Sequence, residues 1–96
     1  MAKLTANQIQ SSLPTIPEWQ HAADTLVRCF QFKDFPAAIR FVDEIAKKAE
    51  AAWHHPDIDI RWNKVTLTLT THDEGGLTEK DPQLAREFDR IAETMS

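Results

Sequence analysis

Three of the four histidines in this sequence lie between residues 53 and 81. His54 and His55 are adjacent and precede Pro56, whereas His72 follows a stretch of alternating threonine and leucine. Imidazole titrates near neutral pH, so one ring can donate a proton while a second ring accepts one. If the fold brings the three rings together, these residues predict a site for general acid–base catalysis.

A metal site is the alternative use of three imidazoles, since three histidines bind zinc in known catalytic sites. Neighbouring residues project in different directions, however, and the sequence has no H-E-x-x-H or C-x-x-C motif. We therefore expect no bound metal, and a metal-dependent hydrolase is the least favoured interpretation. His21 has no titratable neighbour in the sequence, so a surface or structural role is expected for it.

A β-hairpin is expected to bring the histidines together. Residues 57–62 and 65–72 alternate apolar and polar side chains, and only Asn63 and Lys64 separate them, which predicts two antiparallel strands. His72 shares its parity with the threonines of the second strand, so it should lie on the polar face. Because a hairpin returns the chain to its starting edge, His72 should approach the His-His-Pro segment.

The clearest helix precedes that segment. Asp34 is a good N-cap and Pro36 suits the first turn, while Pro56 forces the helix to end near His54 or His55. Apolar residues recur at helical spacing along it. The predicted stripe is Phe35, Ala38, Ile39, Val42, Ile45, Ala46, Ala49 and Trp53.

The remaining elements are a first helix, two more strands and a last helix. Thr5 and Gln8 form a predicted capping box for a helix that ends before Pro14. A short extended stretch from Trp19 precedes a strand over residues 25–32. The last helix carries an apolar stripe of Leu84, Phe88, Ile91, Ala92 and Met95.

The start of the last helix has two alternatives. Asp81 can be its N-cap with Pro82 at the first position, or Thr78 and Asp81 can form a capping box one turn earlier. The whole order predicts one α+β domain over residues 1–96, a two-layer sandwich of a four-stranded antiparallel sheet with three helices on one face. A chain this short has a small core, which favours association into an oligomer.

Composition excludes several classes of function. The net charge is −4 and no run of Lys or Arg occurs, which argues against direct nucleic-acid binding. No apolar run approaches a membrane span, and "MAKLTANQIQ" has no secretion signal, so a cytoplasmic protein is expected. The single cysteine, Cys29, lies in an apolar run and is expected to be a buried, inert thiol.

The segment from residue 53 to residue 81 closely resembles the pterin-4a-carbinolamine dehydratases, or 4a-hydroxytetrahydrobiopterin dehydratases. Their signature is His-His-Pro, a five-residue gap, an aromatic residue, a nine-residue gap, a histidine, and an acidic residue after a glycine-containing loop. A looser similarity extends from about residue 19 to the last helix. The signature positions are filled here by His54, His55, Pro56, Trp62, His72 and Asp81.

This resemblance implies dehydration of 4a-hydroxytetrahydropterin to quinonoid dihydropterin, without metal or cofactor, in tetrahydrobiopterin recycling for aromatic amino acid hydroxylases. It implies catalytic roles for His54, His55 and His72. Two positions depart from the family: Trp53 replaces a frequent acidic or amide residue, and Lys80 a frequent arginine. The residues implied to contact substrate are Glu50, Trp62, Lys80 and Asp81.

Several of these assignments have alternatives. Glu50 is one helical turn before His54 and can orient that ring, or it can be a solvated carboxylate. Asp81 can be only an N-cap, and Trp62 can be a packed hairpin aromatic rather than a surface for the pterin. The resemblance also implies a homodimer or homotetramer. Because an animal member doubles as a dimerisation cofactor for a homeodomain transcription factor, the alternative function is a non-enzymatic interaction or regulatory module.

Overall fold

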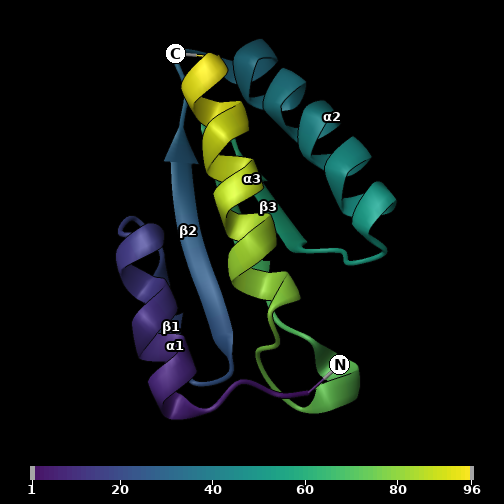
Figure 1. Cartoon of the computed structure of the whole chain (residues 1–96). Coiled ribbons are helices and arrows are strands. Elements are labelled where there is room, and N and C mark those ends of the chain that lie inside the picture. The colour runs from purple at the N-terminus through teal and green to yellow at the C-terminus, as the bar shows by residue number, and fades with distance from the viewer. Residues whose placement is uncertain (1, 96) are drawn as a thin grey trace.

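The computed structural model describes residues 2–95 and consists of one antiparallel sheet with three helices on one face (Figure 1). The strand order in the sheet is β1-β2-β4-β3. This α+β arrangement confirms the predicted fold class and order of elements. The strands are β1 (Gln20–Ala22), β2 (Thr25–Gln31), β3 (Asp57–Arg61) and β4 (Lys64–Leu69). The helices are α1 (Ala6–Ser12), α2 (Phe35–Ala52) and α3 (Lys80–Thr94), with short 3-10 helices η1 (Leu13–Thr15) and η2 (His72–Glu74).

The core lies between the two central strands and the helices. Figure 1 shows α2 and α3 side by side over the sheet, and residues of one parity on β2 and β4 are buried beneath them. The ring centroids of Phe30 on β2 and Phe41 on α2 are 4.7 Å apart. Buried residues of this core on β2, β4, α2 and α3 include Leu26, Phe30, Phe41, Ile45, Val65, Leu67, Leu69 and Phe88.

Two predicted helix starts are confirmed. Thr5 and Gln8 form the capping box of α1, in which the backbone amide of Gln8 donates to Thr5 Oγ1 at 3.2 Å. Asp34 is the N-cap of α2, where its Oδ1 accepts from the Ala37 amide at 2.9 Å. Each side chain satisfies a backbone donor that has no partner within the helix.

The end of α2 corrects the predicted apolar stripe. The helix ends at Ala52, before Pro56 as expected, but Trp53 is a left-handed C-cap with φ of 52° and is 78% exposed. The reversed backbone turns its side chain away from the helical stripe. Phe35, in the first turn, is also exposed rather than part of the core.

The hairpin turn lies one residue earlier than predicted. Arg61 pairs with Lys64, so Trp62 and Asn63 form the turn and Trp62 has a positive φ of 51°. Asn63 is buried, and its side-chain amide donates to the Phe32 carbonyl at 2.7 Å. This bond ties the hairpin turn to the segment after β2.

Two further expectations are wrong. The strand that was expected to reach residue 72 ends at Leu69, and His72 instead begins η2. Cys29 is exposed rather than buried, because its parity on β2 places it on the face of the sheet that the helices leave uncovered. Among residues 2–95, no helix is both long enough and apolar enough to cross a membrane.

Candidate active site

A buried hydrogen bond between a histidine and a carboxyl group joins the end of α2 to the start of α3. His54 Nε2 lies 2.5 Å from Asp81 Oδ1, and Asp81 is completely buried while His54 is only 8% exposed. In sequence the two residues are 27 positions apart. A buried carboxylate must be paired and hydrogen-bonded, since its desolvation is otherwise costly. This pair therefore depends on fixed geometry.

The second oxygen of Asp81 holds the loop that carries His72. Asp81 Oδ2 accepts from Thr71 Oγ1 at 2.8 Å and from the Thr78 amide at 2.9 Å. Thr78 Oγ1 lies 2.9 Å from Thr71 Oγ1. Because the Thr71 hydrogen is used on Asp81, Thr78 must donate the bond between the two hydroxyls.

These contacts also assign the tautomer of His54. A carboxylate can only accept hydrogen bonds, so with Asp81 as a carboxylate its Oδ1 accepts the proton on His54 Nε2, and we assign the tautomer of His54 on this basis. The other ring nitrogen, Nδ1, is then the acceptor of a neutral ring. An adjacent carboxylate stabilises the imidazolium that forms when Nδ1 takes up a proton.

The local sequence explains why His54 turns inward. The amide of His54 donates to the Ala49 carbonyl at 3.1 Å, which closes the helix end after the left-handed Trp53. On the other side, Gly75 has a φ of 75°, and Thr71 pairs with Gly76 across the loop. Both reversals direct the chain back toward Asp81.

The start of α3 matches neither predicted alternative in full, since Asp81 lies inside the helix and is not its N-cap. The helix begins at Lys80, and Glu79 precedes it without a side-chain cap. Asp81 accepts from the Thr78 amide, which is one half of the expected capping box. The Thr78 hydroxyl bonds Thr71 instead of completing the box. The sequence signal for Thr78 and Asp81 was therefore real, but the residues serve the site as well as the helix.

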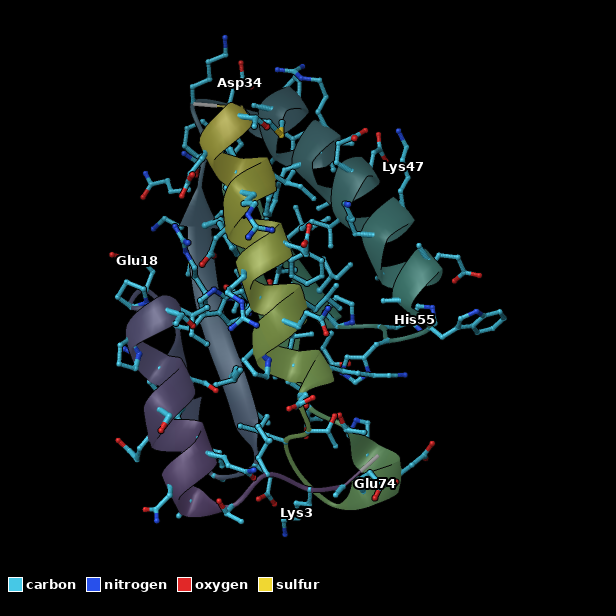
Figure 2. All side chains as sticks on the ribbon, viewed as in Figure 1. Lys3, Glu18, Asp34, Lys47, His55 and Glu74 are labelled. Atoms are coloured by element: carbon cyan, nitrogen blue, oxygen red, sulfur yellow. The ribbon has the colours of Figure 1, made fainter. Side chains whose placement is uncertain are left out.

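The second histidine forms a different pair. His55 Nε2 lies 2.8 Å from Glu50 Oε1, and the side chains are 59% and 69% exposed. Figure 2 shows His55 near the end of α2, at the outer side of the molecule. The expected Glu50–His54 pair is not formed, because the left-handed residue between them breaks the helical spacing.

All three predicted catalytic histidines line one hollow of about 280 Å³. We call it the histidine hollow, and it opens where α2, the end of β4 and η2 meet. Trp53 and the side chains next to His72 line it as well, and sequence reasoning did not find them because only the tertiary fold brings them there. Its lining is Trp53, His54, His55, Thr70, Thr71, His72 and Asp73.

Two residues implied to contact substrate lie elsewhere. Trp62 is at the hairpin turn, at the opposite end of β3 and β4 from the histidine hollow. Lys80 lines a separate cavity between α2 and α3 of about 420 Å³, together with Lys48 and Glu87. Neither residue lines the histidine hollow within one chain. Glu50 and Asp81 do not line the hollow either, but each contacts one of its histidines. A role in substrate binding stays a prediction for all four residues.

The site has no arrangement of side chains suited to a metal. Within residues 2–95, no group of three or more His, Cys, Asp or Glu side chains is placed to hold an ion. Each nitrogen that comes near a carboxylate, on His54 and on His55, already has a hydrogen-bond partner. One oriented imidazole beside two exposed ones is an arrangement that can transfer protons.

The fold and the site together define a class of protein, a small α+β domain with three histidines that line one hollow at one end of its sheet. Comparisons with known proteins give the family. The profile of "Pterin 4 alpha carbinolamine dehydratase" matches residues 2–91. The chain belongs to this pterin carbinolamine dehydratase family, whose members are hydro-lyases.

Individual relatives agree with this assignment. A protein from Nocardia farcinica, provisionally named a pterin-4-alpha-carbinolamine dehydratase, is 51% identical over 89 residues, covering 93% of this chain and 94% of its own length. A relative of the same provisional name from Chloroflexus aurantiacus is 53% identical over 91 residues, covering 95% and 98%.

Two solved structures share the fold. A transcriptional coactivator/pterin dehydratase from Brucella melitensis is 37% identical, with a TM-score of 0.90 over 94% of this chain and 98% of that one. A pterin dehydratase-like protein described as a RuBisCO assembly factor in the alpha-carboxysome is 25% identical, with a TM-score of 0.65 over 77% and 86%. The descriptions of these two proteins thus name a coactivator and an assembly factor beside the dehydratase.

Proposed function

We propose that this protein dehydrates 4a-hydroxytetrahydropterin to quinonoid dihydropterin and water in tetrahydrobiopterin recycling. The observation that carries the proposal is the meeting of His54, His55 and His72 in one hollow, with His54 fixed by a buried carboxylate. Membership of the pterin carbinolamine dehydratase family supplies the substrate class.

The reaction needs two proton transfers. The C4a–O bond breaks when a proton reaches the departing hydroxyl, and loss of the N5 proton completes the C4a=N5 double bond. His54 is suited to be the base, because Asp81 occupies Nε2 and leaves Nδ1 as acceptor. His55 and His72 are exposed and can supply the proton to the hydroxyl. The proton taken and the proton given balance, so the enzyme is unchanged after one turnover and exchange with water.

The size of the hollow is consistent with a small ring system. Its volume of about 280 Å³ is near the lower end of ligand sites, which span roughly 300–1,000 Å³. Trp53 is highly exposed at its edge and offers an indole face on which a flat pterin can stack. Trp53, which departs from the residue types frequent in the family, therefore lies where it can contact the pterin.

Stopped-flow dehydration of 4a-hydroxytetrahydropterin tests the proposal. We expect turnover that persists after exhaustive chelation, since imidazoles alone carry the proton transfers. Absence of turnover would refute the dehydratase function, and turnover lost with chelator and restored by zinc would refute the metal-free mechanism.

A non-enzymatic interaction module is the second candidate. It is supported by the names of the two structural relatives, one a coactivator and one an assembly factor. The uncovered face of the sheet and the exposed edge strand β3 are surfaces that such a role can use. A folded protein with no dehydratase activity at any pterin concentration would favour this function over the first.

We also propose a homodimer or homotetramer whose histidine hollow is formed within one chain. Ile58 and Ile60 on the edge strand β3 point toward the helical side but remain 40% and 38% exposed. An open edge with apolar side chains is commonly protected by a second copy. Sedimentation at micromolar concentration should show at least a dimer.

Mixing subunits tests where the site is formed. His54→Ala subunits mixed with His72→Ala subunits should recover no dehydratase activity, since both residues line the same hollow of one chain. Recovery in the mixture would show that the site is shared between chains.

A further inference from the structure

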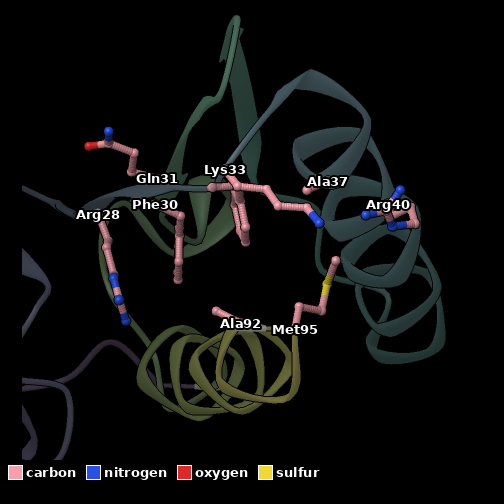
Figure 3. Close-up of a pocket in the computed structure, with 9 residues that line it drawn as sticks. Arg28, Phe30, Gln31, Lys33, Ala37, Arg40, Ala92 and Met95 are labelled. Atoms are coloured by element: carbon pink, nitrogen blue, oxygen red, sulfur yellow. The ribbon is translucent and has the colours of Figure 1, made fainter.

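A larger cavity lies at the opposite end of α2 from the histidines (Figure 3). Its volume is about 480 Å³, and it lies where the end of β2, the first turns of α2 and the last turn of α3 meet. We call it the basic cleft. Its lining is Arg28, Phe30, Gln31, Phe32, Lys33, Ala37, Arg40, Ala92 and Met95.

The basic cleft is separate from the histidine hollow. Ala37 lines the cleft and Trp53 lines the hollow, and helix α2 runs between them. At 1.5 Å per helical residue, these two positions are roughly 24 Å apart. One small ligand cannot reach both, so the cleft is not a part of the proposed dehydratase site.

The cleft concentrates positive charge in an acidic protein. Three of its lining residues are cations and none is acidic, although the net charge of the chain is −4. Arg28 is neutralised by Asp89, whose Oδ1 is 2.7 Å from its guanidinium. Within residues 2–95, Lys33 and Arg40 form no ion pair. Two uncompensated cations therefore border the cavity.

Apart from Gln31, the rest of the lining is apolar and includes two aromatic rings. Figure 3 shows Phe30 pointing toward α3, and Lys33 extending across the opening toward Ala37 and Arg40 on α2. The Arg28 guanidinium lies 4.1 Å from the centroid of the Phe30 ring and forms a side wall. Met95 contributes a thioether, which makes favourable contacts with aromatic rings. The cleft thus pairs an apolar floor with a cationic rim.

We propose that the basic cleft binds a small aromatic anion, a ring system that carries a carboxylate, sulfonate or phosphate. The ring contacts Phe32 and Met95 above the buried Phe30, and the anionic group is bound by Lys33 and Arg40. A few polar groups above an apolar enclosure are typical of small-molecule sites. An acidic peptide could use the two cations but would leave the aromatic floor unfilled, so the small aromatic anion is favoured.

Anilinonaphthalene sulfonate is a suitable probe, because it combines an aromatic body with one sulfonate. In an amide NMR titration of the full chain, we expect saturable binding of one probe per chain with a dissociation constant of order 10⁻⁵ M. The shifted amides should be those of Phe32, Lys33 and Ala37. The amides of His54 and His55 should not move.

Two matched double variants test whether probe binding depends on the cations of the cleft or on the net charge of the protein. The double variant Lys33→Gln with Arg40→Gln should bind the probe at least ~10-fold more weakly, because each substitution removes a charge-assisted bond to the sulfonate. Lys47→Gln with Lys48→Gln removes the same charge further along α2 and should bind as the unaltered protein does. Circular dichroism should show that both variants are folded.

Two comparisons complete the test. Phenylnaphthylamine, which has the same rings without the sulfonate, should bind at least ~10-fold more weakly than the sulfonate. Polyglutamate should not compete with the probe. Equal binding by both double variants, shifts centred on the histidine hollow, or binding of many probes per chain would overturn the proposal. Competition by polyglutamate at similar concentration would replace it with an acidic-peptide site.

Discussion

Two adjacent histidines each contact a carboxylate, and the two pairs have opposite surroundings. The His54–Asp81 pair is buried and joins residues 27 positions apart, whereas the His55–Glu50 pair is exposed and joins residues five positions apart. Breaking a buried contact with a carboxylate costs more free energy than breaking an exposed one, because water and salt screen the exposed contact. The histidine–carboxylate contact is therefore a buried structural support in the first pair and an exposed surface contact in the second.

The difference also separates possible roles in catalysis. His54 cannot rotate freely, because Asp81 is held in turn by Thr71 and Thr78. A ring in a fixed tautomer is suited to accept a proton from a defined atom. His55 is exposed to water, which suits a group that must be reprotonated after each turnover.

The largest effect is expected from removing the buried carboxylate. Asp81→Ala leaves His54, the Thr71 hydroxyl and the Thr78 amide without their acceptor, so we expect the free energy of unfolding to fall by about 3 kcal/mol. Glu50→Ala is the matched control and should change it by less than about 0.5 kcal/mol. Urea denaturation measures both. Equal losses would show that the two pairs do not differ as described.

The second effect concerns the catalytic rings. His54→Ala, His55→Ala and His72→Ala should each lower the rate of dehydration by at least roughly 100-fold, the usual contribution of a general acid or base. His21→Ala, on β1, should be nearly silent. Of the four variants, only His54→Ala should also lose measurable stability, because it leaves Asp81 unpaired. Near-normal rates in the three variants of the hollow would refute the site assignment.

A smaller effect is expected from the support of Asp81. Thr71→Val keeps the shape of the side chain but removes a bond to a buried carboxylate, so dehydration should fall by about 10-fold. Thr70→Val is the matched control, since its hydroxyl also lines the hollow but donates to the Asp24 carbonyl instead. A rate loss that is the same in both variants would remove Thr71 from the positioning network.

Local patterns predicted those parts of the fold that depend on neighbouring residues. The Asp34 and Thr5 caps and the antiparallel hairpin follow from short-range chemistry, and the structure contains all three. The left-handed geometry of Trp53 and Trp62 has no such signal, because glycine is the usual residue at positive φ. The predicted register and helix stripe failed at these two positions.

The sequence predicted which histidines form the site better than it predicted the hydrogen bonds that hold them. Spacing and the family resemblance singled out the three histidines that now line one hollow. The partner of Glu50 was misassigned, because helical spacing does not extend past a reversed residue. The contacts of Thr71 and Thr78 with Asp81 arise only when the loop closes onto α3, which no periodic pattern encodes.

The most direct test of the account compares two isosteric substitutions in one stopped-flow assay. Dehydration of 4a-hydroxytetrahydropterin would be measured for Asp81→Asn and Glu50→Gln, each shown to be folded by circular dichroism. A carboxamide at residue 81 has only one acceptor oxygen, so it cannot accept from both His54 and Thr71 as the carboxylate does, and the His54 tautomer is no longer fixed. Glu50→Gln changes only the exposed contact with His55, so no buried hydrogen bond is lost. We predict a rate loss at residue 81 that exceeds the loss at residue 50 by at least ~10-fold. Equal losses, or a larger loss for Glu50→Gln, would contradict the account.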